Sequence, residues 1–285
     1  MYIQRVHRAY AKINLGLIIR SKRPDGFHNI ETVFHTIDLF DEIELTESSA
    51  VTVTSSDPEA PGGDQNIAHK AIVLLQRHCA TNRGATIHLH KHIPVGAGLG
   101  GGSSDAALVM REVPKIWDVD IDDQTLRDLA LELGSDVPYF LGDGSALASG
   151  RGENLRYFRL DVPFWILLCN PGIHVSTAWA YAHVTASRHR VDLQSIVQEG
   201  MTDPALLAQN LTNDFETVVF QRYPEVRQLK EDMIQGGALF ALMSGSGSSV
   251  FGLFPDEESL DRVDRIFTTR HYTTFRTRPN FSPLR

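Results

Sequence analysis

The residues with the clearest chemical potential lie between positions 94 and 107, where five glycines precede a helix-forming run. The stretch reads Pro-Val-Gly-Ala-Gly-Leu-Gly-Gly-Gly-Ser-Ser-Asp-Ala-Ala. Glycine permits positive φ angles and lets a ligand approach the backbone without a Cβ in the way. We expect a helix over 105–111 that is capped by Ser103, Ser104 or Asp105 and ended by Pro114. Because the N–H groups and the dipole at such a helix start attract anions, the stretch predicts a phosphate-binding loop.

Three other interpretations of this stretch compete. A flexible surface turn fits poorly, because apolar residues interleave with the glycines. A Walker A loop is excluded, because no Gly-Lys-Ser/Thr follows. The Gly-x-Gly-x-x-Gly spacing from Gly96 to Gly101 keeps a nicotinamide-binding oxidoreductase open as an alternative. Pro94 at the start of the loop, and the lack of a clear acidic strand end after it, argue against that alternative.

A lysine and an asparagine occupy one face of the first expected strand. Over residues 6–20, apolar side chains alternate with polar ones, which is typical of a half-buried strand. Lys12 and Asn14 are two positions apart and therefore point to the same side of this strand.

An aspartate lies in apolar company after the helix expected over 122–133. Asp136 is followed by Val137, Tyr139 and Phe140. A carboxylate among such neighbours usually has a partner or a task. Phosphoryl transfer requires a phosphate cradle, a cation and a group that orients or deprotonates the acceptor. The glycine loop, Lys12 and Asp136 could supply these three parts.

The composition excludes several classes of protein. The chain has 285 residues and a formal net charge of −8, which disfavours sequence-independent nucleic-acid binding. Its two cysteines, Cys79 and Cys169, do not form a disulfide framework or a metal-binding spacing. No apolar run reaches transmembrane length, and residues 1–5 lack the apolar core of a signal peptide. We expect a cytoplasmic protein without membrane or nucleic-acid partners.

The remaining pattern predicts a mixed α/β protein, with a domain boundary near residue 150 where glycines at 142–144 and 150–152 mark loops. The strand expected over 85–93 carries His88, His90 and His92 on one face, but no cysteine or carboxylate is near in sequence, so we expect no metal site. Further strands are expected over 30–39, 41–47, 51–54, 164–169, 238–243, 250–254 and 273–278. Further helices are expected over 66–78, 204–209, 214–222, 225–235 and 257–267, with one more starting at Ser176 or Thr177.

Taken together, the motifs resemble the GHMP kinase superfamily over nearly the whole chain. They lie at Ala11–Leu15, Asp25–His28, Pro94–Ala107, Gly134–Pro138, Ser244–Phe251 and Ser282–Leu284. The Lys-x-Asn, Asp-Gly-aromatic-His and Asp-Val-Pro motifs resemble the branch that uses ATP to phosphorylate the 2-hydroxyl of a methylerythritol linked to cytidine diphosphate. That reaction belongs to the non-mevalonate route to isoprenoid precursors. Another GHMP small-molecule kinase, of the homoserine or mevalonate type, is the alternative.

The resemblance implies a two-domain α/β (α+β) fold with the active site in the cleft between the domains. Residues 1–150, with a tail at about 274–285, would bind ATP and carry the catalytic groups. Residues 151–273 would bind the substrate. The family likeness leaves a monomer or a weak homodimer open.

The resemblance also implies roles for individual residues. Lys12 and Asp136 would be the catalytic pair, with Asp136 taking the proton of the hydroxyl or orienting it, and Lys12 keeping Asp136 ionised. The ATP phosphates, bridged by Mg²⁺, would be wrapped by Pro94, Gly96, Ala97, Gly98, Leu99, Gly100, Gly101, Gly102, Ser103 and Ser104, with Asn66 beside the adenine. The substrate would be held by Asn14, Phe27, His28, Thr177 and Tyr181.

Within the substrate site, Asn14 would hold the methylerythritol and His28 would read the edge of the cytosine. The cytosine would stack between Phe27 and Tyr181, with Trp179 as the alternative to Tyr181. Phe27 stands where the family usually has tyrosine, so a hydroxyl contact is lost while stacking survives. Tyr10 and Ser135 also depart from the usual proline and alanine.

Overall fold

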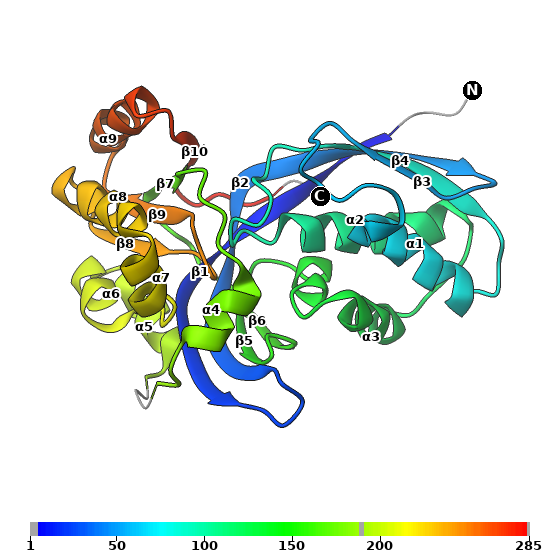
Figure 1. Ribbon diagram of the computed structural model, residues 1–285, viewed down its shortest axis with the longest axis horizontal. Coiled ribbons are helices and arrows are strands. Elements are labelled where there is room, and N and C mark those ends of the chain that lie inside the picture. The colour runs from blue at the N-terminus through cyan, green and yellow to red at the C-terminus, as the bar shows by residue number, and fades with distance from the viewer. Residues whose placement is uncertain (1–4, 188–190, 284–285) are drawn as a thin grey trace.

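Two long antiparallel strands run across the middle of the molecule. The computed structural model describes residues 5–187 and 191–283. β1 (Arg5–Lys22) and β2 (His28–Ser48) separate one group of helices from another (Figure 1). The strand predicted over 6–20 is confirmed. The two strands predicted over 30–39 and 41–47 are one, because Phe40 continues the ladder opposite Tyr10.

A six-stranded sheet is built on β2. The strand pairs with β1 along its length and with shorter strands at its two ends. β4 (Gly84–His90) pairs with the C-terminal part of β2, and β3 (Thr52–Ser55) lies parallel to β4. β5 (Ser145–Gly150) pairs with the N-terminal part, and β6 (Asn154–Phe158) follows. The sequence pattern predicts only loops around 142–152, because glycines mark both ends of β5.

Helices α1 (Ile67–His78), α2 (Gly101–Ile116) and α3 (Asp123–Leu133) gather beside β3 and β4 (Figure 1). Two short 3₁₀ turns lie next to them, η1 (Gly63–Gln65) before α1 and η2 (Val137–Leu141) after α3. Apolar side chains of α1 and α2 form one core with those of β2 and β4. This core fixes the start of α2 relative to the sheet.

Helix α2 differs from the prediction at both ends. It begins at Gly101, after Gly100 with a φ of +73°, so Ser103, Ser104 and Asp105 lie inside the helix and do not cap it. The glycines had hidden this first turn, because glycine is a poor helix former. The helix also continues through Pro114 to Ile116, since a proline near the end of a helix removes only one of its hydrogen bonds.

The second sheet has four antiparallel strands in the order β10-β7-β9-β8. The strands are β7 (Trp165–Asn170), β8 (Phe240–Met243), β9 (Val250–Phe254) and β10 (Thr273–Thr277). The helices of this part are α4 (Thr177–His183), α5 (Leu193–Gly200), α6 (Pro204–Asn210), α7 (Glu216–Arg222), α8 (Pro224–Gln235) and α9 (Glu257–Thr269). Of these elements, only α5 had not been predicted.

The two sheets share an apolar core. Alternate residues of β1, including Ala11, Ile13 and Leu15, pack in one cluster with Leu168 of β7 and Phe251 of β9. The residues between them therefore face the other way. The register of β1 against β2 also shifts between Tyr10 and Lys12, and such bulges re-aim the side chains beside them. Together these features turn Lys12 and Asn14 away from the core.

The chain passes from the first sheet to the second between β6 and β7, after residue 158. The C-terminal tail returns to the first sheet, since the Phe281 ring lies 5.8 Å from that of Tyr10. The division near residue 150 and the assignment of the tail stay predictions. Leu284, Arg285 and the N-terminal residues 1–4 lie outside the described residues. Within the described ranges, no helix is long and apolar enough to cross a membrane.

Candidate active site

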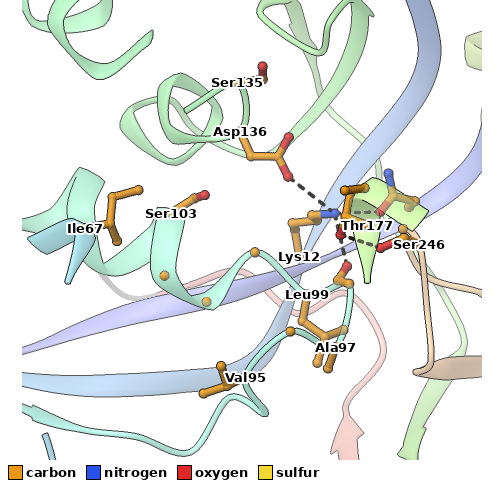
Figure 2. A pocket seen from close by; sticks show the side chains of 18 of the residues that line it. Lys12, Ile67, Val95, Ala97, Leu99, Ser103, Ser135, Asp136, Thr177 and Ser246 are labelled. Carbon is orange, nitrogen blue, oxygen red and sulfur yellow. Dashed lines mark hydrogen bonds and ion pairs between the residues drawn. The ribbon is translucent and has the colours of Figure 1, made fainter. Parts of the chain in front are cut away.

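A cavity of about 860 Å³ brings the predicted residues together from both halves of the chain. Figure 2 shows Lys12 and Asp136 facing each other, with Ser103 on one side and Thr177 and Ser246 on the other. The predicted residues that line it are Lys12, Asn14, Phe27, His28, Asn66, Pro94, Gly96, Ala97, Gly98, Leu99, Gly100, Gly101, Gly102, Ser103, Asp136, Thr177 and Tyr181. Every predicted site residue except Ser104 therefore lines one cavity.

The glycine loop turns sharply before α2. Gly96, Gly98 and Gly100 have φ angles of +66°, +80° and +73°, which only glycine adopts without strain. The first helical hydrogen bond runs from the Ser104 N–H to the Gly100 carbonyl at 2.9 Å. The N–H groups of the three residues before Ser104 thus have no acceptor within the helix. They point out of its positive end, where an anion is favoured.

The glycine loop packs directly against a second glycine turn, at 244–249. A Cβ on Gly98 would collide with the backbone carbonyl of Ser244. The Ser244 hydroxyl donates to the Gly98 carbonyl at 3.0 Å. Asn213 holds the second turn from behind, since its Nδ2 donates to the carbonyls of Met243 and Gly245 at 2.7 and 2.8 Å. The two turns, which come from the two sheets, form one rigid wall of the cavity.

Lys12 is buried at the centre of the site, with 3% of its surface exposed. Its Nζ donates to Asn14 Oδ1 at 2.7 Å and to the Gly98 carbonyl at 3.1 Å, and lies 3.7 Å from Asp136 Oδ2. Burial lowers the pKa of Lys12, and the negative charge of Asp136 opposes this shift. Because all three partners are acceptors, the surroundings are built to hold an ammonium group.

Of the partners of Lys12, Asp136 is the one whose side chain remains accessible from the cavity. It immediately precedes η2, where the chain turns after α3, and a third of its side chain is exposed. Asn14, in contrast, is tied down, because its Nδ2 donates to Thr32 Oγ1 at 2.9 Å. A hydroxyl group entering the cavity can therefore reach the Asp136 carboxylate while Lys12 remains in place.

The aromatic residues predicted to bind the cytosine are arranged differently from the expectation. The His28 ring stacks on Tyr181, with centroids 5.0 Å apart. Phe27 is half exposed, and the Arg151 guanidinium lies 4.7 Å from its ring centroid. A cytosine between Phe27 and Tyr181 would have to move His28 aside. Trp179, the alternative to Tyr181, is outside this cavity and packs on Tyr223 and His183.

Two residues that were predicted to contact ATP make hydrogen bonds within the protein instead. Ser104 is buried and lines a separate cavity behind α2, and its N–H is used within the helix. Asn66 caps α1, because its Oδ1 accepts from the Ala68 N–H at 2.8 Å and its Nδ2 donates to the Pro61 carbonyl. Asn66 thus lines the cavity with its side-chain polar atoms already paired.

Sequence reasoning missed three cations that line the cavity: Lys22, Lys91 and Arg151. Arg151 had been interpreted as part of a loop between two glycines. The position of Lys91, three residues before Pro94 at the start of the glycine loop, is the one sequence feature that could have predicted its place in the cavity. Lys22 is followed by Arg23 in a turn, whereas Lys91 and Arg151 have no neighbouring lysine or arginine, and only the fold shows that the three converge.

The histidines of β4 lie apart from this cavity. His88 is hydrogen-bonded to Thr54 at 2.7 Å and His90 to Glu44 at 3.1 Å, while His92 follows the strand. In the parts of the chain that the structure describes, no three His, Cys, Asp or Glu side chains are grouped as metal ligands.

The chain resembles known proteins over nearly its whole length. A family model described as GHMP kinases N terminal domain matches residues 66–144, and one described as GHMP kinases C terminal matches residues 193–273. A protein of Prosthecochloris aestuarii named 4-diphosphocytidyl-2-C-methyl-D-erythritol kinase is 44% identical over 273 residues, which cover 94% of this chain and 95% of that protein. The chain belongs to the GHMP kinases.

Solved structures extend the comparison. The crystal structure of a 4-(cytidine 5'-diphospho)-2C-methyl-D-erythritol kinase matches this GHMP kinase with a TM-score of 0.81 and 31% identity, over 96% of this chain and 98% of that one. Homoserine kinase from Cytophaga hutchinsonii matches with a TM-score of 0.71 at 17% identity, over 98% and 96% of the two chains, and so shares the fold alone. The predicted two-domain GHMP kinase fold is confirmed.

The contact between the two glycine turns yields a test. We expect Gly98→Ala to lower the free energy of unfolding by at least about 1–2 kcal/mol, the cost of a left-handed backbone for alanine, because the new Cβ also meets the Ser244 carbonyl. Gly102→Ala is the matched control. A Cβ there meets only an Ile67 methyl at 3.5 Å, and alanine in a helix stabilises by about 0.5–1 kcal/mol. Urea denaturation of both variants measures this, and equal stabilities would contradict the proposed packing.

Proposed function

We propose that this GHMP kinase transfers the γ-phosphoryl group of ATP to the 2-hydroxyl of 4-diphosphocytidyl-2-C-methyl-D-erythritol. One observation carries the proposal. Lys12 Nζ and Asp136 Oδ2 lie 3.7 Å apart, beside the glycine loop that leads into α2. A cation and a carboxylate thus flank the place where a phosphate on the loop and a hydroxyl in the cavity would meet.

The glycine loop would bind the nucleotide through backbone N–H groups at the start of α2. These groups are fixed by the helix and need no rearrangement to meet the phosphate oxygens. Leu99 is held from the other side, because its carbonyl accepts from the Lys12 N–H at 3.0 Å. The phosphates and the Lys12 ammonium are therefore positioned by the same few residues.

The chemical step follows from this arrangement. Asp136 accepts the proton of the acceptor hydroxyl as its oxygen bonds to the γ-phosphorus and the bond to the ADP oxygen breaks. Lys12 keeps the Asp136 carboxylate ionised and stabilises the negative charge on the transferred group. The products are ADP and the phosphorylated alcohol.

Mg²⁺ would enter with the nucleotide and neutralise its phosphate oxygens. Residues 96–103 of the glycine loop supply N–H donors and no carboxylates, and Asp105 after them pairs with Lys91, so the phosphate oxygens themselves would provide most ligands of the ion. Within the described ranges we assign no side chain to the metal.

The cytidine half would lie at the end of the cavity where Phe27, His28 and Tyr181 converge. Lys22 and Arg151 line the same end and would balance the charge of a diphosphate. Burial, followed by the nearby charge of Lys22, lowers the pKa of His28, which keeps its ring neutral near pH 7 and able to hydrogen-bond a base edge. We further place the protein in the cytoplasm, as a monomer or weak homodimer.

Homoserine- and mevalonate-type activities are the alternative, because homoserine kinase shares the fold. The first experiment is ADP release in a coupled assay with ATP, Mg²⁺ and each acceptor in turn. We expect release with 4-diphosphocytidyl-2-C-methyl-D-erythritol and none with homoserine or mevalonate. Release with either of the others alone would overturn the proposed substrate.

In the same assay, Asp136→Asn should lower kcat about 10²–10⁴-fold, the usual contribution of a positioned base. Asp143→Asn makes the same chemical change at an exposed position outside the cavity, and should leave kcat unchanged. Nucleotide binding and the melting temperature of Asp136→Asn should match the parent. A kcat close to that of the parent would refute the role of Asp136.

Cytidine recognition can be tested by thermal melting. A ligand at a hundred times its Kd stabilises by about 2.7 kcal/mol, so saturating CDP should raise Tm by about 5 °C. Tyr181→Leu, which keeps apolar bulk but removes the ring, should lose most of this shift. Trp179→Leu should keep it, because Trp179 lies outside the cavity. A shift that is equal in both variants would refute stacking on Tyr181.

A further inference from the structure

Three charged groups that the proposed mechanism does not use form a buried cluster beside the glycine loop. Lys91 Nζ contacts Asp41 Oδ2 and lies 2.7 Å from Asp105 Oδ2. The side chains of Lys91, Asp41 and Asp105 are 4%, 0% and 4% exposed. Asp41 also accepts from the backbone N–H groups of His92 and Ile93, at 2.6 and 2.9 Å. The cluster thus ties β2, the segment before the glycine loop and α2 together.

The cluster holds one positive charge for two carboxylates. Leaving a net charge unpaired in a dry interior is costly, and two carboxylates that share a site retain a proton more readily than either alone. Asp105 Oδ1 is buried and has no hydrogen-bond partner among the described residues, which is the position that a proton would serve. Burial, with the nearby charge of Asp41 and against that of Lys91, raises the pKa of Asp105 to about 7.

The charges acting on Asp105 come from Lys91 and Asp41. Among the elements packed on α2, β1 contributes Lys12, whose ammonium is turned to Asp136, and also His7 and Arg8, which line a separate cavity with Arg111 and Glu112 of α2. On β2, the His35 ring is hydrogen-bonded to Ser145 and Glu44 pairs with His90. The ionisable side chains of α1 and α3 are exposed, apart from a partly buried His69. Burial would lower the pKa of Lys91, but the two carboxylates raise it, so Lys91 stays charged. The proton content of the cluster is therefore set by its two carboxyl groups.

The cluster borders the place where nucleotide phosphates are proposed to bind. Lys91 and Asp105 both line the cavity, and Lys91 Nζ lies 3.5 Å from where a Cβ on Gly101 would stand. A polyphosphate at the start of α2 would add negative charge close to two carboxylates that share a single cation, Lys91. That charge favours the protonated form of the cluster over the ionised one.

We propose that nucleotide binding in this cavity is coupled to the uptake of a proton by the Asp41–Lys91–Asp105 cluster. The inference rests on the nucleotide site proposed above. The proton comes from the buffer and bonds to a carboxylate oxygen of the pair, which makes the cluster neutral when the nucleotide is bound. By reciprocity, the affinity for nucleotide falls as pH rises through the range where the free cluster loses its proton.

Binding of ADP should take up a proton only at a pH where the free cluster is ionised, so proton uptake is compared at two pH values. Around pH 8 the free cluster has largely lost its proton and ADP is fully ionised, so binding should draw in up to about one proton. Calorimetric titration of ADP in Tris and in HEPES, whose ionisation enthalpies differ, measures this number from the difference in observed heat. Around pH 5.5 the cluster already holds its proton, and the uptake by the cluster should vanish.

Asp105→Asn is the decisive variant, because the amide keeps an acceptor for Lys91 and gives the cluster a fixed neutral charge. It should bind ADP at pH 8 with no linked proton from the cluster, and its Kd should change little between about pH 7.5 and 9, where ADP itself stays ionised. Asp264→Asn is the matched control. Asp264 is also buried, with an Oδ1 that finds no hydrogen-bond partner in the described part of the chain, but it pairs with Arg276 and does not line this cavity. Its proton uptake should equal that of the parent.

Three outcomes would overturn the proposal. Equal proton uptake by Asp105→Asn and the parent would place the titrating group elsewhere. A parent that binds ADP with no proton uptake at pH 8 and a Kd independent of pH would refute the coupling without any variant. A folded parent that binds no ADP would refute the nucleotide site itself, and with it the inference.

Discussion

A buried ammonium group must be surrounded by acceptors, and the site depends on how Lys12 meets this constraint. Its three acceptors come from β1, the glycine loop and the corner before η2. The Gly98 carbonyl that accepts from Lys12 also accepts from Ser244, so the second sheet is bound into the same network. Displacing any one of these segments would leave a buried polar group unpaired, which costs about 1–3 kcal/mol. The geometry proposed for catalysis and the contact between the two glycine turns are thus held by the same hydrogen bonds.

β1 carries apolar side chains for the core on one face and polar side chains for the cavity on the other. Alternate residues of β1 join the apolar core between the two sheets, while Lys12 and Asn14 face the cavity. The core makes the position of the strand rigid, and rigidity is what electrostatic catalysis needs, because charges that are already in place do not reorganise during the reaction. The cluster around Lys91 repeats this principle on the other side of the glycine loop, with one carboxylate more than its cation can balance.

Much of the fold and most of the lining of the site could be predicted from local pattern. Alternation located β1 and the face of Lys12, and the glycine spacing located the loop. The start of α2 was misplaced because glycines at a helix start resemble a continuing loop. Ser104, which the family resemblance assigns to the phosphates, therefore lies inside the helix rather than at its start. The charges at Lys91, Asp105 and Arg151 were missed because their significance depends on residues distant in sequence. His28, which the family resemblance assigns to the cytosine edge, stacks its ring on Tyr181 in the fold, a contact that depends on residues distant in sequence.

The central claim is that Lys12 and Asp136 act as one unit, and a double-mutant cycle tests it most directly. The kcat of Lys12→Met, of Asp136→Asn and of the double variant would be measured with 4-diphosphocytidyl-2-C-methyl-D-erythritol, after ADP binding has shown that each protein is folded. We expect Lys12→Met to lose about 10²–10³-fold or more, and the double variant to be about as slow as the slower single variant. A Lys12→Met enzyme close to the parent in kcat, or losses that multiply in the double variant, would contradict the account.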